Sequence, residues 1–407
     1  MSKLDELIAE LCPNGVEYKT IAEIATDIFR GSGITRDQIT DDGIPCVRYG
    51  EIYTTYDIWF DECVSHTDET QIANKKYFEY GDILFAITGE SVEEIAKSCA
   101  YVGHQKCLAG GDIVVLKHKE DPKYLSYALS TTKAQIQKSK GKVKSKVVHS
   151  SVPAIKEIKL PVPPLEVQRE IVRVLDNFTF LTAELTAELT VRQKQFDYYR
   201  NILLTFHSSS NAKMKTLKDI CIKISSGGTP NTSISSYYDG DIPWLRTQEV
   251  DFNEINETAM YITEEGLNNS SAKWIPKHSV IVAMYGATVG KVAFTSIPVT
   301  TNQACCNLEI NSNVANYKYV FYWLSKEYEY IKSLGQGSQT NINAQIVKNL
   351  KIAIPELSEQ ERIVECLDKF NGICRSLTSG IPAEIAARQK QYEYYRDKLL
   401  TFKELNA

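Results

Sequence analysis

The densest group of residues with an obvious chemistry is a run of lysines between residues 133 and 149. This stretch, KAQIQKSKGKVKSKVVH, contains no acidic residue. Its lysines are Lys133, Lys138, Lys140, Lys142, Lys144 and Lys146. Ammonium groups alternating around Gly141 and Ser145 favour a flexible loop or hairpin that follows a phosphate backbone. A solvated surface loop is the alternative interpretation.

Loops rich in glycine and short polar residues form a second group. They read RGSGITR (30–36), SSGGTPNTS (225–233) and GQGSQTNIN (335–343). Arginine can bind guanine with two hydrogen bonds, Gln and Asn can read base edges, and glycine allows close backbone approach. Arg48 and Arg246 stand at matched positions, although such arginines could equally form structural ion pairs. The candidate DNA-binding residues are Arg30, Gly31, Ser32, Arg36, Arg48, Lys140, Lys142, Lys144, Lys146, Gly227, Gly228, Thr229, Arg246, Gln248, Ser338, Gln339, Asn341 and Asn343.

Residue patterns for catalysis are weak in comparison. Cys99, His104 and Cys107 have loosely zinc-like spacing, with His118 as a possible fourth ligand, but free thiols are the stronger interpretation. The segment 286–292 resembles a phosphate loop that is one residue short and has Val292 where magnesium binding needs Ser or Thr. We interpret it as a tight turn beside a strand. The sequence therefore predicts no catalytic residue, no metal site and no cofactor in this chain.

The elements that must position these loops are set by an internal repeat. RQKQFDYYRNILLTF (192–206) and RQKQYEYYRDKLLTF (388–402) are identical at eleven of fifteen positions, at an offset of 196 residues. A second pair, 159–178 and 351–370, matches at an offset of 192. Two diverged segments thus alternate with two preserved ones.

The preserved segments have the apolar period of long helices. Each stripe covers about forty residues, roughly 60 Å of helix, which favours a coiled coil of one stripe with the other. We expect Ser379–Pro382 to break or kink the second helix, whereas the first has TAELTAEL (182–189) at that point. The residues expected to pack are Leu181, Leu185, Leu189, Phe196, Tyr199, Leu203, Leu377, Ile381, Ile385, Tyr392, Tyr395 and Leu399.

The diverged segments read as mixed α/β (α+β) units. Expected strands are 46–53, 81–88 and 111–117 in the first unit, and 244–250, 279–286 and 304–310 in the second. We predict two globular domains, 1–160 and 208–352, separated by an antiparallel coiled coil of two helices, 161–207 and 353–407. The internal repeat gives this arrangement pseudo-twofold symmetry.

Composition limits the class of protein. The net charge of -5 over 407 residues excludes a uniformly basic DNA-coating protein, but not a local basic groove. The longest apolar run, Val280–Met284, is far too short for a membrane helix, and the first residues do not resemble a signal peptide. Ten cysteines without framework spacing favour reduced thiols, and hence a cytoplasmic location.

The two RQKQ segments, TAELTAEL and the alternating layout together resemble the specificity (S) subunit of Type I restriction–modification systems. The resemblance extends over essentially the whole chain, although the diverged units match only in outline. It implies two target recognition domains, each reading one half of a bipartite, asymmetric site in double-stranded DNA, with the helices setting the gap between the halves.

The same resemblance implies partners that carry the catalysis. Two methyltransferase (M) subunits would dock around the helices and bind S-adenosylmethionine. Two restriction (R) subunits would use ATP and magnesium. This chain would be a non-catalytic subunit without a membrane contact. The alternatives are a single-chain methyltransferase, against which the absent motifs argue, and a coiled-coil scaffold without a nucleic-acid role, against which the lysine run argues.

Overall fold

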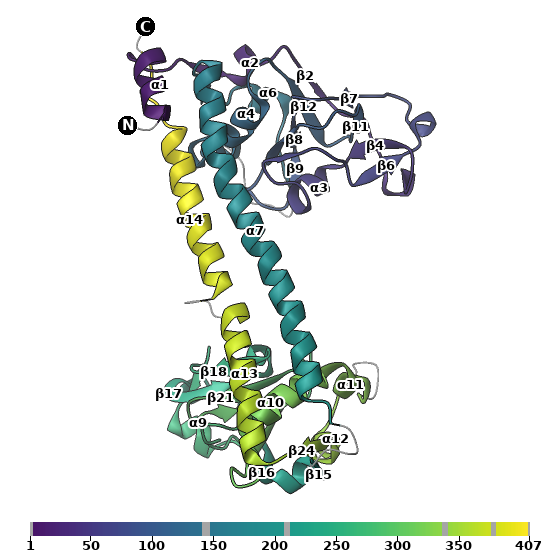
Figure 1. Ribbon diagram of the computed structural model, residues 1–407, viewed down its shortest axis with the longest axis vertical. Helices are drawn as coiled ribbons and strands as arrows, with labels where there is room; N and C mark the ends of the chain where they lie inside the picture. Colours follow the sequence, from purple (N-terminus) through teal and green to yellow (C-terminus); the bar gives the residue numbers. More distant parts are fainter. Residues whose placement is uncertain (1–2, 141–146, 207–211, 336–340, 376–379, 406–407) are drawn as a thin grey trace. The chain divides into compact units, whose positions relative to one another are not determined.

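The computed structural model describes residues 3–140, 147–206, 212–335, 341–375 and 380–405. The chain divides into two compact units, and Figure 1 labels many of their helices and strands. Unit 1 consists of Met1–Thr186 together with Ile385–Ala407, and unit 2 consists of Ala187–Glu384. Unit 1 is therefore assembled from two distant stretches of sequence, whereas unit 2 is continuous.

Unit 1 is built on two five-stranded sheets. The first has the order β2-β12-β8-β10-β5, with bounds Asp27–Arg30, Ile113–Lys117, Ile83–Ala86, Ser98–Tyr101 and Trp59–Phe60. The second has the order β3-β6-β4-β11-β7, with bounds Ile39–Thr40, Ser65–Thr67, Ile44–Val47, Cys107–Ala109 and Tyr77–Phe78. Two further pairs are β1 (Tyr18–Thr20) with β14 (Lys159–Pro161), and β9 (Thr88–Gly89) with β13 (Val148–His149). The short helices are α1 (Lys3–Leu11), α2 (Ile21–Ile24), α3 (Tyr49–Thr54), α4 (Pro122–Leu129), α5 (Thr132–Ser139) and α6 (Val152–Lys156).

Unit 2 repeats this plan. Its five-stranded sheet has the order β16-β23-β20-β21-β18, with bounds Cys221–Ser226, Cys305–Ile310, Val280–Ala283, Val292–Thr295 and Asn253–Ile255. A three-stranded sheet has the order β19-β17-β22, with bounds Tyr261–Ile262, Tyr238–Leu245 and Thr300–Thr301. β15 (Lys213–Thr216) pairs with β24 (Lys351–Ile354). The short helices are α8 (Leu217–Ile220), α9 (Glu264–Asn268), α10 (Tyr317–Lys326), α11 (Tyr328–Ser333) and α12 (Ala344–Asn349).

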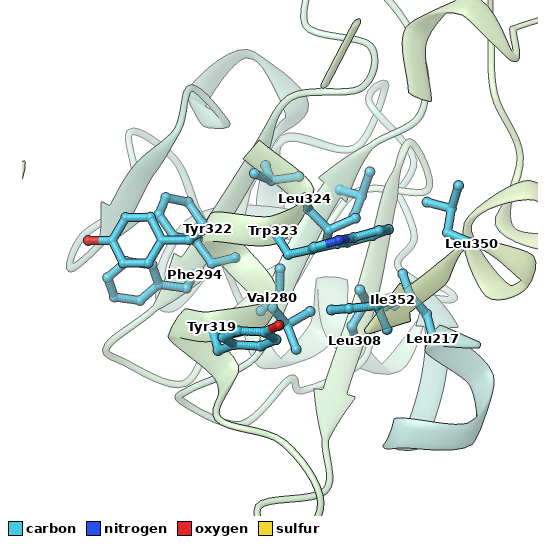
Figure 2. Packing of buried hydrophobic residues seen from close by; sticks show 14 of the residues in the cluster. Leu217, Val280, Phe294, Leu308, Tyr319, Tyr322, Trp323, Leu324, Leu350 and Ile352 are labelled. Atoms are coloured by element: carbon cyan, nitrogen blue, oxygen red, sulfur yellow. The ribbon is translucent and has the colours of Figure 1, made fainter. Parts of the chain in front are cut away.

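The cores form where apolar strands are covered by helices. In unit 2, Val280 and Leu308 of the sheet are fully buried in one cluster with Tyr319 and Leu324 of α10. Figure 2 shows these side chains together with Trp323, which is also part of the cluster. Strand β20 is buried at all four positions, so its apolar run fits a central strand covered on both faces.

Helix α7 (Leu165–Leu203) extends for 39 residues without interruption and contributes to both units. The second preserved segment is divided into α13 (Leu357–Arg375) and α14 (Ile381–Leu399). Gly380 lies outside both helices, as the break expected at Ser379–Pro382 requires, whereas Ile381 and Pro382 are helical and Ser379 lies outside the described residues. Pro382 stands in the first turn of α14, where its missing N–H costs no helical hydrogen bond.

Each unit contains a pair of helix segments with matching contacts. In unit 1 the rings of Phe178 and Tyr395 stack with centroids 5.5 Å apart. In unit 2 those of Phe370 and Tyr199 are 5.4 Å apart. These are the same two repeat positions with the roles of the helices exchanged, so the expected pairing of preserved segments holds within each unit.

The same polar network anchors a helix segment to each unit. In unit 1, Asp176 accepts hydrogen bonds from Lys123 Nζ and Tyr127 Oη, both at 2.8 Å. In unit 2, Asp368 accepts them from Lys318 Nζ at 2.7 Å and Tyr322 Oη at 2.6 Å. Because these carboxylates are partly exposed, the networks contribute orientation more than free energy.

The distant parts of unit 1 are joined by backbone and side-chain hydrogen bonds. Val16 N–H donates to Lys403 O, and Leu405 N–H donates to Val16 O, both at 2.9 Å. The hydroxyl of Tyr18 donates to Phe402 O at 3.1 Å. The end of the second preserved segment therefore completes unit 1 rather than unit 2.

Two segments that were expected to be strands are only partly extended. β4 ends at Val47 and is followed by α3, and β17 ends at Leu245 and is followed by a 3-10 turn, Thr247–Glu249. In each case an acid three residues after an arginine accepts that arginine's backbone N–H: Glu51 from Arg48 at 3.0 Å, and Glu249 from Arg246 at 3.1 Å. This hydrogen bond, which is the acid's half of a capping box, starts a helical turn that hydrophobic alternation does not reveal.

Candidate nucleic-acid interface

A surface hollow of unit 1 gathers the three arginines predicted for this unit. The hollow has a volume of about 690 Å³ and is lined by Arg30, Arg36 and Arg48. The tripeptide Gly110–Asp112, which joins β11 to β12, lines the same hollow. β11 runs parallel to β4, so the segments that follow both strands meet at this edge of the sheet.

The three arginines are held to different degrees. The guanidinium of Arg30 donates to Gly111 O and forms an ion pair with Asp112 at 2.5 Å. Arg48 Nε donates to Glu51 Oε1 at 3.1 Å, so the structural ion pair considered from sequence is present. Arg36 is exposed in the 3-10 turn Arg36–Gln38. The hollow thus offers three guanidinium groups, of which those of Arg30 and Arg48 are held in place by two carboxylates that partly balance their charge.

Unit 2 has the corresponding site at the same backbone positions. There β22 runs parallel to β17, with Leu245 opposite Thr301, so Arg246 and Asn302 are neighbours where the strands end. Asn302 N–H donates to Leu245 O at 3.0 Å, as Gly110 N–H donates to Val47 O at 2.8 Å. The tripeptide Asn302–Ala304 then leads into β23.

The chemistry at this second site differs from that of unit 1. Gln248 and Gln303 are exposed, and Thr229 Oγ1 donates to Gln303 Oε1. Arg246 Nε and Asn302 Oδ1 are buried and have no hydrogen-bond partner among the described residues. The acid that holds Arg48 in unit 1 is used differently here, since Glu249 Oε2 accepts from the backbone N–H of Ala259 at 2.7 Å.

The predicted glycines serve the protein's own backbone. A Cβ on Gly31 would lie 2.2 Å from Gly110 O, and a Cβ on Gly227 would lie 1.9 Å from Thr301 O. A side chain at either position would collide with the strand that leads into the tripeptide. Gly228 N–H donates to Thr301 O at 2.9 Å, as Ser32 N–H donates to Ala109 O at 2.8 Å.

The sequence favoured a flexible loop or hairpin for the lysine run, but part of the run is helical. Residues through Ser139 form α5, because Thr131 caps the helix by accepting from Ala134 N–H. Lys138 is buried at 4% exposure and donates to Ser98 Oγ at 3.3 Å, so it is not a surface cation. Burial lowers its pKa to about 7. Lys140 is exposed at the end of α5, whereas Lys142, Lys144 and Lys146 lie outside the described residues.

The remaining candidates have structural partners or fall outside the description. Ser32 is buried and its hydroxyl donates to Asn74 O. Asn343 caps α12 by accepting from Gln345 N–H and Ile346 N–H at 2.9 and 3.0 Å. Asn341 Oδ1 is buried without a partner in the described part of the chain. Ser338 and Gln339 lie outside the described residues.

The predicted helix-packing residues vary in burial. Phe196 and Tyr392 are buried at 7% exposure each, whereas Leu181, Tyr199 and Tyr395 retain 43%, 43% and 40%. Intermediate burial is found for Leu185, Leu189, Leu203, Ile381, Ile385 and Leu399. Leu377 lies outside the described residues. Burial therefore alternates along each stripe, since Tyr199 and Tyr395 stay far more exposed than Phe196 and Tyr392 three residues earlier.

Neither sequence pattern for metal or nucleotide chemistry forms a site. Cys99 and Cys107 are buried in strands while His104 is exposed, and no metal-binding group of three His, Cys, Asp or Glu occurs among the described residues. Lys291, the lysine of the phosphate-loop resemblance, forms an ion pair with Asp251 at 2.7 Å. Gly286 and Gly290 have positive φ angles of 83° and 82° in the turn before β21, as that interpretation expected.

Sequence reasoning missed the residues that link the strands. Gly110, Gly111 and Asp112 belong to the unit 1 hollow, and Asn302 and Gln303 occupy the same place in unit 2. A signal was available, because Ala109 and Thr301 are separated by 192 residues, the same offset that relates 159–178 to 351–370. Aligning the repeats through this offset would have identified the linking tripeptides.

Comparisons with known proteins agree with this duplicated plan. The model of the Type I restriction modification DNA specificity domain matches residues 13–191 and again 209–387. The Type I restriction enzyme EcoR124I/EcoR124II specificity subunit of Escherichia coli is 40% identical over 260 residues, 61% of this chain. That match spans 63% of the relative's own length.

Solved structures share the fold at low sequence identity. The S subunit of a Type I restriction–modification system from M. genitalium has a TM-score of 0.54 and 15% identity, covering 95% of this chain and 96% of its own. A structure reported for complex assembly and conformational transition of the type I R-M system has a TM-score of 0.61 and 16% identity, covering 95% and 98%. The expected mixed α/β fold with two specificity domains is confirmed. None of the helices in the described ranges is long and apolar enough to cross a membrane.

Proposed function

Because the chain belongs to the Type I restriction–modification DNA specificity family, we propose that it is the DNA sequence-specificity subunit of such a complex. Each unit reads one half of a bipartite, asymmetric site in duplex DNA. The observation that carries this proposal is the duplicated edge site: one backbone frame presents Arg30, Arg36 and Arg48 in unit 1, and Arg246 with amide side chains in unit 2. A scaffold without a nucleic-acid role would not require that frame to carry different donors and acceptors.

The recognition domains of this proposal are residues 1–160 and 208–352, and the spacers are 161–207 and 353–407. The helices set the distance between the half-sites and dock two M subunits, to which two R subunits are added. The exposed aromatic side chains Tyr198 and Tyr394, both 61% exposed at matched repeat positions, are suitable docking contacts. S-adenosylmethionine belongs to the M subunits, and ATP and magnesium to the R subunits.

The decisive experiment measures binding of the chain, assembled with its M partner, to duplexes carrying the sequence methylated in the host. A duplex with both half-sites should bind more tightly than duplexes with either half scrambled. Equal binding of all duplexes would contradict the proposal. The chain prepared without M should transfer no methyl group from S-adenosylmethionine, and methylation by rigorously M-free protein would contradict its non-catalytic role.

The lysine run contributes affinity rather than sequence readout in this proposal. Changing Lys140, Lys142, Lys144 and Lys146 together to Ala should weaken binding about equally for every sequence. Each lost phosphate contact should lower the slope of log affinity against log salt by roughly one. Lys133→Ala, an exposed lysine on α5, is the single-site comparison. An unchanged slope in the fourfold variant would assign the run to a solvated surface.

A further inference from the structure

The two units differ most sharply in the tripeptide that carries the chain from one sheet to the other. In unit 1 it is Gly110–Asp112, and in unit 2 it is Asn302–Ala304. The backbone is the same in both: Ile113 N–H donates to Gly110 O at 3.1 Å, and Cys305 N–H donates to Asn302 O at 3.2 Å. The frame is therefore constant while the side chains that it presents are exchanged.

In unit 1 the tripeptide binds the side chain of an arginine. Asp112 and Gly111 O both bind the guanidinium of Arg30, which stands at the end of β2. The corresponding residue at the end of β16 in unit 2 is Ser226, and Ala304 stands where Asp112 does. Unit 2 therefore lacks this arginine–carboxylate pair and has two amides, Asn302 and Gln303, in place of two glycines.

The amides of unit 2 are placed for recognition. Gln303 is exposed, and its Oε1 accepts from Thr229 Oγ1, which fixes the plane of the amide. Nε2 remains as a donor, and the second lone pair of Oε1 remains as an acceptor. Next to it, Asn302 Oδ1 and Arg246 Nε lack partners among the described residues. Unpaired buried donors and acceptors are costly. A turn of the half-buried Asn302 side chain that brings its amide to a polar ligand at this edge would lower that cost.

We propose that Asn302 and Gln303 determine the base specificity of the half-site read by unit 2, with Thr229 as a positioning residue for Gln303. This inference rests on the proposed function. Amide side chains offer a donor and an acceptor together, the combination that pairs with the major-groove edge of adenine. Unit 1 has arginine donors on the same backbone frame and therefore binds base edges rich in acceptors, such as the major-groove edge of guanine.

The experiment maps methylation by the complete S and M complex in a host that lacks other methyltransferases. Gln303→Ala and Gln303→Glu are the principal variants, because this side chain is exposed and its loss should not impair folding. Asn302→Ala is the second position. The matched control is Asn313→Ala, an exposed amide beyond the far end of β23.

We expect discrimination at one or two positions of the second half-site to fall on the order of tenfold or more, with the first half-site and the gap unchanged. Gln303→Glu, which has only acceptors, should shift the preference at its position rather than merely relax it. Thr229→Val should relax the same position less than Gln303→Ala does. The control should leave the motif unchanged.

Three results would overturn the inference: an unchanged motif in the Gln303 variants, uniformly weaker methylation of an unchanged motif, or changes in the first half-site. The second would assign Gln303 to a phosphate contact. Failure of the proposed function is recognised separately, because the wild-type complex would then show no bipartite methylated motif at all.

Discussion

Replacing Lys138 with Leu should stabilise unit 1, and the gain should decrease as the pH rises. The ammonium of Lys138 is buried between α5 and the first sheet, 3.3 Å from Ser98 Oγ and 5.9 Å from the centroid of the Phe85 ring. In unit 2, α11 follows α10 as α5 follows α4, and its buried residue is the apolar Ile331. An apolar side chain therefore already occupies the buried face of the related helix.

The size of the effect follows from the pKa of Lys138. Desolvation lowers the pKa to about 7 in the folded state, against 10.5 for an ordinary lysine. The unfolded chain thus binds more protons between these values, so the stability of the wild type rises as pH increases from 7 toward 10.5. At 1.36 kcal/mol per pKa unit, burying this group costs the folding of unit 1 about 4 kcal/mol at pH 7 and about 2 kcal/mol at pH 9.

The assay is hydrogen exchange of the β8 and β10 amides, corrected for intrinsic rates, in wild type and Lys138→Leu at pH 7, 8 and 9. The difference in protection free energy should shrink by about 2 kcal/mol between pH 7 and pH 9. Lys133→Leu, on the exposed face of α5, should show no such trend. Parallel pH profiles for the wild type and Lys138→Leu would refute the reasoning.

Three further changes test the architecture. Gly227→Ala should displace the end of β22, since the new Cβ would meet Thr301 O. Methylation mapping should then show the second half-site lost, while the first half-site still binds in a gel-shift assay. Inserting one additional TAEL within 182–189 lengthens α7 by about 6 Å and rotates the following residues by about 40° beyond a full turn. The methylated motif should therefore keep both half-sites, and the gap between them should grow by one to two base pairs. A chimera that keeps residues 1–207 and takes its second half from another family member should replace one half-site only; a change in both would show that the units do not read DNA independently.

The repeat and the helices were predictable because they rest on local periodicity and on identity within one chain. The apolar stripe through Phe196 and Tyr392 and the interruption before Ile381 needed no tertiary information. The strand expectations failed beyond Val47 and Leu245, where side chains of Glu51 and Glu249 cap a turn. Such a hydrogen bond outweighs a weak strand preference, and it cannot be recognised from alternation.

The candidate site was predictable only in part, because it depends on which strands become neighbours. Arg30, Arg36 and Arg48 were identified by residue type, but their gathering requires the parallel pairing of β4 with β11, which is non-local. Lys138 was wrongly expected to be an exposed lysine of the basic run for a similar reason. It stands only two residues before the exposed Lys140, yet α5 directs its side chain toward the sheet. Periodicity over one short helix does not tell which lysine faces inward.

The discontinuity of unit 1 has a consequence for synthesis on the ribosome. Unit 2 lies entirely within Ala187–Glu384, so all of its residues emerge before Tyr392 and Leu400, which belong to the core of unit 1. The nascent unit 1 therefore cannot complete its fold, and part of its apolar core stays uncovered, while unit 2 is already free to fold. Incomplete chains that end before Leu400 would carry a closed second unit and an unfinished first one, the kind of intermediate that aggregates or recruits chaperones. The backbone hydrogen bonds of Val16 with Lys403 and Leu405 form last of all. Residues near the start of the chain, which are translated first, are therefore among the last to be fixed in the fold.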